Sequence, residues 1–198
     1  MTMRTVRSVR TVRTVLCLAK AEASLLLRSL LMLAGLLAGG FAMWLYFRRA
    51  EPLWWDAAWR IGLGQLILGT AVMVAAQLAA GRPRRDGLAD LYASFPVTAA
   101  TRTLAHLAGL AGAVPASLLL AGAVTAAVQV RGAIGTPDVA VLAGGLLLVI
   151  AAGSAGIAIG SRFPHPLAGV LGALVLLLSS GTSRLASGAA IWLVPWQN

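Results

Sequence analysis

Five long apolar segments, separated by short polar stretches, run along the chain at residues 30–47, 61–80, 103–128, 139–160 and 167–183. Each has roughly the 17–25 residues that an α-helix needs to cross about 30 Å of hydrocarbon. None contains Asp, Glu, Lys or Arg, whereas a soluble core helix of this length would carry a polar stripe. The alternation typical of membrane barrel strands is also missing. The pattern predicts an all-α integral membrane protein, a bundle of about five transmembrane helices forming one transmembrane domain over residues 1–198.

Composition supports the same fold class. Hydrophobic residues make up 59% of the chain and charged residues 11%, against about 25% charged in a soluble domain. The net charge of +10 lies in tails and loops, so the expected partners are anionic membrane lipids and not nucleic acid. The single cysteine, Cys17, excludes an intrachain disulfide and a cysteine metal cluster. Fifteen of the sixteen basic residues are Arg, a composition typical of GC-rich bacteria.

The basic residues also predict the orientation. With a cytoplasmic N-terminus, the inner segments 1–29, 81–102 and 161–166 hold eleven basic and three acidic residues, a net charge of +8. The outer segments hold five basic and three acidic residues, a net charge of +2. The positive-inside rule therefore favours an inner N-terminus and, with five spans, an outer C-terminus in the bacterial cytoplasmic membrane.

The N-terminal segment has two expected parts. Residues 1–13 form a basic cytoplasmic tail, which is either disordered or part of a helix. Residues 14–28 predict an amphipathic helix on the inner membrane surface. Its apolar face holds Leu18, Leu25 and Leu26, and Lys20, Glu22 and Arg28 are available to headgroups. A signal peptide is not expected, because the apolar run at 15–19 is shorter than the usual 7–15 residues.

The spans lack the residues of catalytic chemistry. Their few polar side chains include Gln65, Thr70, Gln77 and His106. Either Gln65, Thr70 and Gln77 line a substrate pathway, or the two glutamines reach toward the membrane surfaces from opposite ends of their span. We expect His106 to be an interfacial hydrogen-bonding residue rather than a proton relay. The chain contains no metal-ligand spacing, paired carboxylates, nucleophile motif or nucleotide-binding loop. We therefore expect no catalytic, cofactor or metal residues, and any energy for uphill transport has to come from a partner.

Small residues and one proline predict how the spans pack. Gly35 and Gly39 form one small-xxx-small pair, and Gly156 and Gly160 form another. Such pairs let helices approach closely in lipid. Pro115 removes one backbone hydrogen bond inside the third span and should kink it near the carbonyl of Ala111.

The inner loop between the second and third spans predicts a short amphipathic helix over residues 86–96. Asp86 is the expected N-cap, and Pro96 should end the helix after Phe95. The apolar positions follow helical spacing, at Leu88, Leu91, Tyr92 and Phe95. About ten residues are marginal as an isolated helix. The apolar face therefore needs a surface, which is the lipid interface, the bundle itself or a partner protein.

This order of features resembles the permease subunit of type-2 ATP-binding-cassette (ABC) exporters. The stretch 87–98, Gly-Leu-Ala-Asp-Leu-Tyr-Ala-Ser-Phe-Pro-Val-Thr, followed by Arg102, is similar to the family's loop between spans two and three. The stretch 160–166, Gly-Ser-Arg-Phe-Pro-His-Pro, is similar to its turn into span five. The likeness covers about residues 14–190.

The resemblance implies a role for each part. Residues 14–28 would be the connecting helix, and 86–96 the coupling helix that docks on a cytoplasmic ABC ATPase through Asp86, Leu88, Leu91, Tyr92 and Phe95. Arg162 and Phe163 would form a second cytoplasmic contact. Two permeases, identical or homologous, would form a dimer around the substrate pathway.

One departure stands out, because the family has six spans and this sequence has five. Residues 184–198 are expected to be an outer tail, the start of a re-entrant stretch in a chain that lacks its last span. The alternative function is a non-transport membrane scaffold or accessory subunit, and an adjacent gene encoding an ATPase would favour the transporter.

Overall fold

The structure, a computed structural model, describes residues 3–47, 53–88, 90, 94, 97–132, 134–136 and 139–182. Within these residues the regular elements are helical, and the only bridge of β type is the isolated pair Leu53 and Ile134. In chain order the elements are α1 (Met3–Leu27), α2 (Leu30–Phe47), α3 (Trp54–Arg85), α5 (Ala99–Gly109), the 3₁₀ turn η1 (Leu110–Ala113), α6 (Val114–Val130), α7 (Val139–Arg162) and α8 (Leu167–Thr182).

Three helical stretches of the described chain are long and apolar enough to cross a membrane. They are Ala57–Arg85, Ala99–Val130 and Val139–Arg162. A fourth is counted if Val12–Leu27 and Leu30–Leu45, which meet at 54°, form one broken span. The apolar part of α8 is shorter, at Leu167–Ser180. The all-helical class is therefore confirmed, and the number of candidate spans is three to four where the sequence predicts five.

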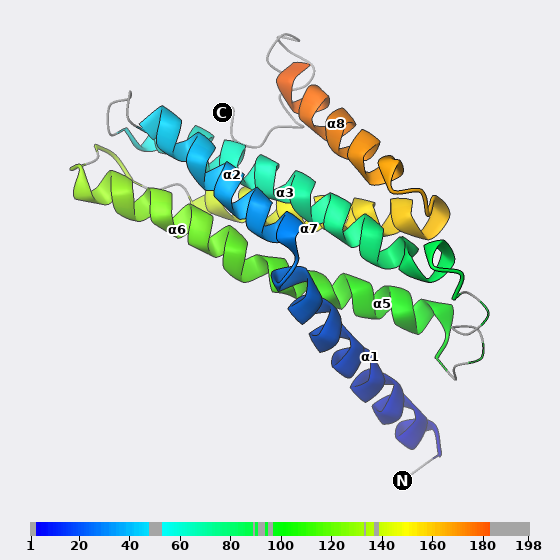
Figure 1. Cartoon of the computed structure of the whole chain (residues 1–198). Helices are drawn as coiled ribbons and strands as arrows, with labels where there is room; N and C mark the ends of the chain where they lie inside the picture. Colours follow the sequence, from blue (N-terminus) through cyan, green and yellow to red (C-terminus); the bar gives the residue numbers. More distant parts are fainter. Residues whose placement is uncertain are drawn as a thin grey trace.

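Helix α3 is the centre of the bundle. It packs against α7 along much of its length and also contacts α2, α6 and α8, and Figure 1 shows α2 and α7 lying along it. Leu68 and Val72 of α3 and Val149 of α7 are fully buried. The predicted span 61–80 is too short at both ends, because α3 continues for a further turn or more in each direction.

Glycines make the close helix contacts, as the sequence predicts. A Cβ on Gly39 of α2 would lie 2.9 Å from the carbonyl oxygen of Gly64 in α3. In α7, a Cβ on Gly156 or Gly160 would collide with a backbone carbonyl of α3. The two small-xxx-small pairs therefore pack against α3 within one chain.

The third span begins earlier than residue 103 and changes geometry before its proline. Thr98 caps α5, and its hydroxyl oxygen accepts a hydrogen bond from the backbone N–H of Thr101 at 3.2 Å. Pro115 stands in the first turn of α6, directly after η1. The missing proline N–H is accommodated by this 3₁₀ turn, and the predicted kink of the span stays a prediction.

The buried polar residues of α3 contradict the sequence-based expectation. Gln65 and Gln77 have no exposed surface, so neither reaches toward the membrane surface. Gln65 donates through Nε2 to the carbonyl oxygen of Ser117 at 2.7 Å and accepts from the Ser117 hydroxyl at 2.9 Å. Arg60, counted above among loop residues, lies within α3 and is 2% exposed. Each of these polar side chains is buried because α3 has neighbours on several sides.

Helix α1 begins at Met3, so it includes residues assigned above to a basic tail. Its second half crosses α5 and η1, and Figure 1 shows its N-terminal half extending away from the bundle. A Cβ on Gly112 would lie 2.8 Å from the carbonyl oxygen of Ala23. Small residues on both sides bring α1 close to the start of the third span.

Candidate functional site

The two segments expected to contact a partner lie at the same end of the bundle, which we call the arginine end. The C-terminus of α3, the N-terminus of α5, the C-terminus of α7 and the N-terminus of α8 meet there (Figure 1). Its described arginines are Arg82, Arg84, Arg85, Arg102 and Arg162. The opposite end holds the bridge between Leu53 and Ile134. The structure thus brings together the two inner loops, which hold five of the eleven predicted inner basic residues.

Asp86 has a different local role from the predicted one. It is the C-cap of α3, not the N-cap of a following helix. Gly87 has φ +67°. The N–H of Leu88 donates to the carbonyl oxygen of Pro83 at 2.9 Å, and the N–H of Gly87 donates to the carbonyl oxygen of Arg84 at 3.4 Å. These bonds form a Schellman motif, in which glycine adopts the left-handed conformation at low cost. Asp86 also pairs with Arg85 Nε at 3.4 Å.

The loop that follows is described only in part. Asp86 and Leu88 are exposed. Between residues 89 and 96 the structure describes Asp90 and Ser94, both with helical backbone. Leu91, Tyr92 and Phe95 lie outside the described residues, so the apolar face of the 86–96 helix stays a prediction.

The turn at 161–166 is tied to α3 by side chains. Gln77 Nε2 donates to the carbonyl oxygens of Phe163, at 3.3 Å, and His165, at 3.0 Å. Arg84 donates through Nη1 to the carbonyl oxygen of Ser161. The Phe163 side chain is 61% exposed, and Arg162 is exposed beside it. The backbone of the turn is held against α3 while its two predicted contact residues face outward.

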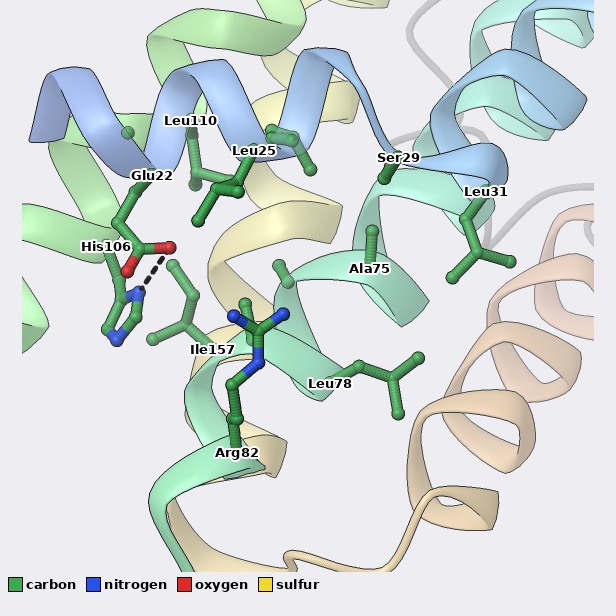
Figure 2. Close-up of a pocket in the computed structure, with 14 residues that line it drawn as sticks. Glu22, Leu25, Ser29, Leu31, Ala75, Leu78, Arg82, His106, Leu110 and Ile157 are labelled. Carbon is green, nitrogen blue, oxygen red and sulfur yellow. Dashed lines mark ion pairs between the residues drawn. The ribbon is translucent and has the colours of Figure 1, made fainter. Parts of the chain in front are cut away.

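A charged pocket beside the arginine end joins five helices. It has a volume of about 160 Å³, and it is lined by residues of α1, α2, α3, α5 and α7 together with η1. Figure 2 shows the Glu22 and His106 side chains directed toward each other, with the Arg82 guanidinium directed toward the same space. His106 Nδ1 lies 3.5 Å from Glu22 Oε2. The interfacial role expected for His106 is therefore an ion pair with α1.

Glu22, expected from the sequence to face lipid headgroups, instead lines this pocket. Ala19, Glu22 and Ala23 follow helical spacing, and so do His106, Gly109 and Gly112 on the other helix. A Cβ on Gly109 would lie 2.8 Å from Glu22 Cβ. Each of these two sets combines small residues with one ionisable residue. This shared pattern is the sequence signal from which the contact between α1 and α5 could have been predicted.

The ion pair changes the acidity of Glu22, which lies in α1, ahead of the first predicted span. The hydrogen bond with His106 lowers the pKa of Glu22 below its ordinary value of 4.5. Coulombic attraction to His106 and Arg82 acts in the same direction, while partial burial acts against it. The carboxylate is therefore charged at neutral pH.

No family model, curated protein or solved structure matches this chain. Its function therefore has to be inferred from its own residues and geometry. Among the described residues there is no group of three or more His, Cys, Asp or Glu placed to hold a metal ion. Glu22 and His106 pair with each other, Arg82 adds a positive charge, and the remaining lining is mostly aliphatic, as expected for packing or for an amphiphilic ligand.

The acidity of Glu22 makes the attachment of α1 dependent on pH. A lowered folded-state pKa stabilises the folded contact above about pH 4.5, and this stabilisation is lost as the pH falls through the lower folded value. We expect Glu22→Gln to loosen α1 from α5 at pH 7 and to remove most of the acid sensitivity. The measurement is a spin-label distance between Cys17, which is exposed in α1, and a cysteine introduced at the exposed Thr103 of α5.

Lys20→Gln is the control, because Lys20 is an exposed charge on the same helix. The wild-type distance distribution should broaden on acidification, and that of the Lys20 variant should follow it. An unchanged Glu22→Gln distribution at pH 7 would show that the ion pair does not hold α1 in place.

Proposed function

We propose that this chain is the membrane-spanning permease subunit of an ABC transporter, of the type-2 exporter kind, and that a separate cytoplasmic ATPase drives it. The observation that carries the proposal is that the 161–166 turn lies at the arginine end together with the described ends of the 86–96 loop, residues 86–88 and 97–98. These are the two segments whose sequences resemble the family's cytoplasmic contacts.

The local bonding supports a mechanical role for this end. The 86–96 loop leaves the C-terminus of α3 directly after a Schellman motif. Gln77 and Arg84 of the same helix bind the backbone of the turn between α7 and α8. A partner that moves either segment therefore pulls on α3, α7 and α8 together, because side-chain bonds and close glycine contacts join these helices.

The proposal includes five spans, with the arginine end and the N-terminus in the cytoplasm of a bacterial cell. The arginines at this end follow the positive-inside rule. A dimer of permeases would enclose the substrate pathway. ATP binding would shift such a dimer between inward- and outward-facing states only to the extent that the ATPase binds the two states with different affinity.

The test is affinity purification of the tagged chain from its native membrane in mild detergent, with partners identified by mass spectrometry. We expect a cytoplasmic ABC ATPase to co-purify. Replacement of Leu91 and Phe95 by Asp should lower its recovery by about tenfold or more, because charges in the centre of a docking face remove its main contacts.

The matched control is the double replacement of Val130 and Ile134 by Asp. These residues are 88% and 74% exposed and lie at the opposite end of the bundle. The control adds two negative charges to exposed apolar positions, so ATPase recovery should stay at the wild-type level. Recovery that is equal for all three proteins would contradict docking through 86–96. The absence of any ATPase beside intact, folded chain would favour the scaffold or accessory subunit.

A further inference from the structure

Two pockets lie next to each other beside the arginine end. The first, the charged pocket described above, has a largely aliphatic wall that includes Leu25, Leu26, Leu78 and Leu110. The second, which we call the arginine pocket, has a volume of about 220 Å³ and is lined by Arg84, Arg102, Thr103 and Ser161, among others. His106 and Ile157 belong to the lining of both pockets.

The pockets are ordered along α3. The first takes its α3 lining mainly from residues 75–79, and the arginine pocket takes its lining from Ala80, Pro83 and Arg84. The arginine pocket therefore lies about one helical turn closer to the end of α3. Apart from Glu22, Ser29, Arg82 and His106, the cavity on the side of the apolar span is aliphatic, and the cavity on the side of the loops is cationic. This order matches the polarity of one leaflet of a bilayer.

The charges of the arginine pocket suit an anion. Arg84 donates one N–H to the carbonyl oxygen of Ser161, and a guanidinium has five N–H groups in total. The hydroxyls of Thr103 and Ser161 donate to carbonyls of their own helices, at 3.1 Å and 2.8 Å. Arg84 therefore keeps donors for a ligand, and Arg102 adds a second guanidinium charge to the lining. The carboxylate of Glu22 lines only the first pocket, where it pairs with His106.

We propose that these two pockets together form a binding site for one anionic phospholipid. Its phosphate would lie in the arginine pocket between Arg84 and Arg102, and the upper part of an acyl chain would lie along the aliphatic wall of the first pocket. A basic cavity between membrane helices is the recognised setting for anionic headgroups. The site goes beyond the transporter function and needs no ATPase partner.

The experiment is native mass spectrometry of the full chain in detergent, titrated with phosphatidylglycerol or with phosphatidylcholine of the same acyl chains. We expect tighter binding of phosphatidylglycerol. The double variant Arg84→Gln/Arg102→Gln should weaken it by about tenfold or more, since each arginine beside an anionic lipid contributes separately. The matched control is Arg85→Gln/Arg162→Gln, which removes two exposed arginines of the same end that line neither pocket.

Two further variants keep the test decisive if the glutamine variant does not fold. Replacement of Arg84 and Arg102 by Lys retains the charges and should retain most of the binding. Ala79→Phe, which fills the first pocket, should weaken phosphatidylglycerol binding while leaving the arginines in place.

Three results would overturn the proposal: equal binding of the two lipids by the wild type, an equal loss in the Arg85/Arg162 control, or unchanged binding in Ala79→Phe. Glycerol phosphate, which has the anion without the chains, should compete weakly. Competition as strong as that of phosphatidylglycerol would assign the arginine pocket to soluble phosphate esters instead.

Discussion

Replacement of Gly156 by leucine is expected to abolish the packing of α7 on α3 and to prevent the chain from folding into this bundle. A Cβ at this position would collide with the carbonyl oxygen of Met73 and would lie 3.0 Å from its Cα. These are backbone atoms inside a helix, so a change of rotamer cannot relieve the overlap. Overpacking against movable side chains costs about 1–3 kcal/mol, and we expect about 3 kcal/mol or more here because the helices themselves must separate.

Gly122 of α6 provides the matched control, because no atom lies within 4 Å of a Cβ built there. Both positions are inside helices, so both replacements gain the same helix propensity. We expect Gly122→Leu to keep the wild-type thermal midpoint in detergent and a single size-exclusion peak. Gly156→Leu should lose the peak or lower the midpoint strongly. A stable Gly156→Leu protein would show that α3 and α7 do not pack as described.

Gln77→Leu is expected to lower the free energy of unfolding by about 2 kcal/mol and to loosen the 161–166 turn. The change removes the two N–H groups that Gln77 donates to the carbonyl oxygens of Phe163 and His165, and each such hydrogen bond contributes about 0.5–1.5 kcal/mol. Gln77 Oε1 is a buried atom with no hydrogen-bond partner in the described part of the chain. Its removal offsets part of that cost, so the net effect is smaller than the sum.

Hydrogen exchange of the turn separates this effect from general destabilisation. The N–H of Ala168 donates to the carbonyl of His165 at 3.1 Å, and its exchange should become faster in Gln77→Leu. Gln65→Leu is the control, since it removes the buried pair with Ser117 and leaves the turn untouched. Equal protection of Ala168 in wild type and Gln77→Leu would show that Gln77 does not hold the turn. Under the transporter proposal, Gln77→Leu should also reduce ATPase recovery.

The elements that the sequence predicts well are those with a local signal. The boundaries predicted for 30–47 and 139–160 agree with α2 and α7 to within two residues. Such runs are apolar on all faces, so their helices follow from length and composition alone. The small-xxx-small pairs were predicted from spacing, and they pack as expected because glycine spacing is itself a local property.

The prediction was wrong where helices continue into polar sequence. Charge at Arg60 and the Arg82–Arg85 run suggested loops, whereas α3 includes all of these residues. Its C-terminal turns are stabilised by bonds to the turn at 161–166, about 80 residues away in the chain. A hydrophobicity window contains no information about such distant partners. Asp86 was misassigned for the same reason, since its role as a C-cap depends on where α3 ends.

By itself the sequence determined the helical class, the apolar stretches, the glycine contact faces and the gathering of positive charge outside those apolar stretches. These properties depend on residues close together in the chain, so composition and spacing are enough to predict them. The tertiary structure alone decided that Gln65 and Gln77 are buried, that Glu22 meets His106, and that two pockets share one wall. Each of these depends on which helices become neighbours, because a polar side chain is oriented by the donor or acceptor that another helix supplies.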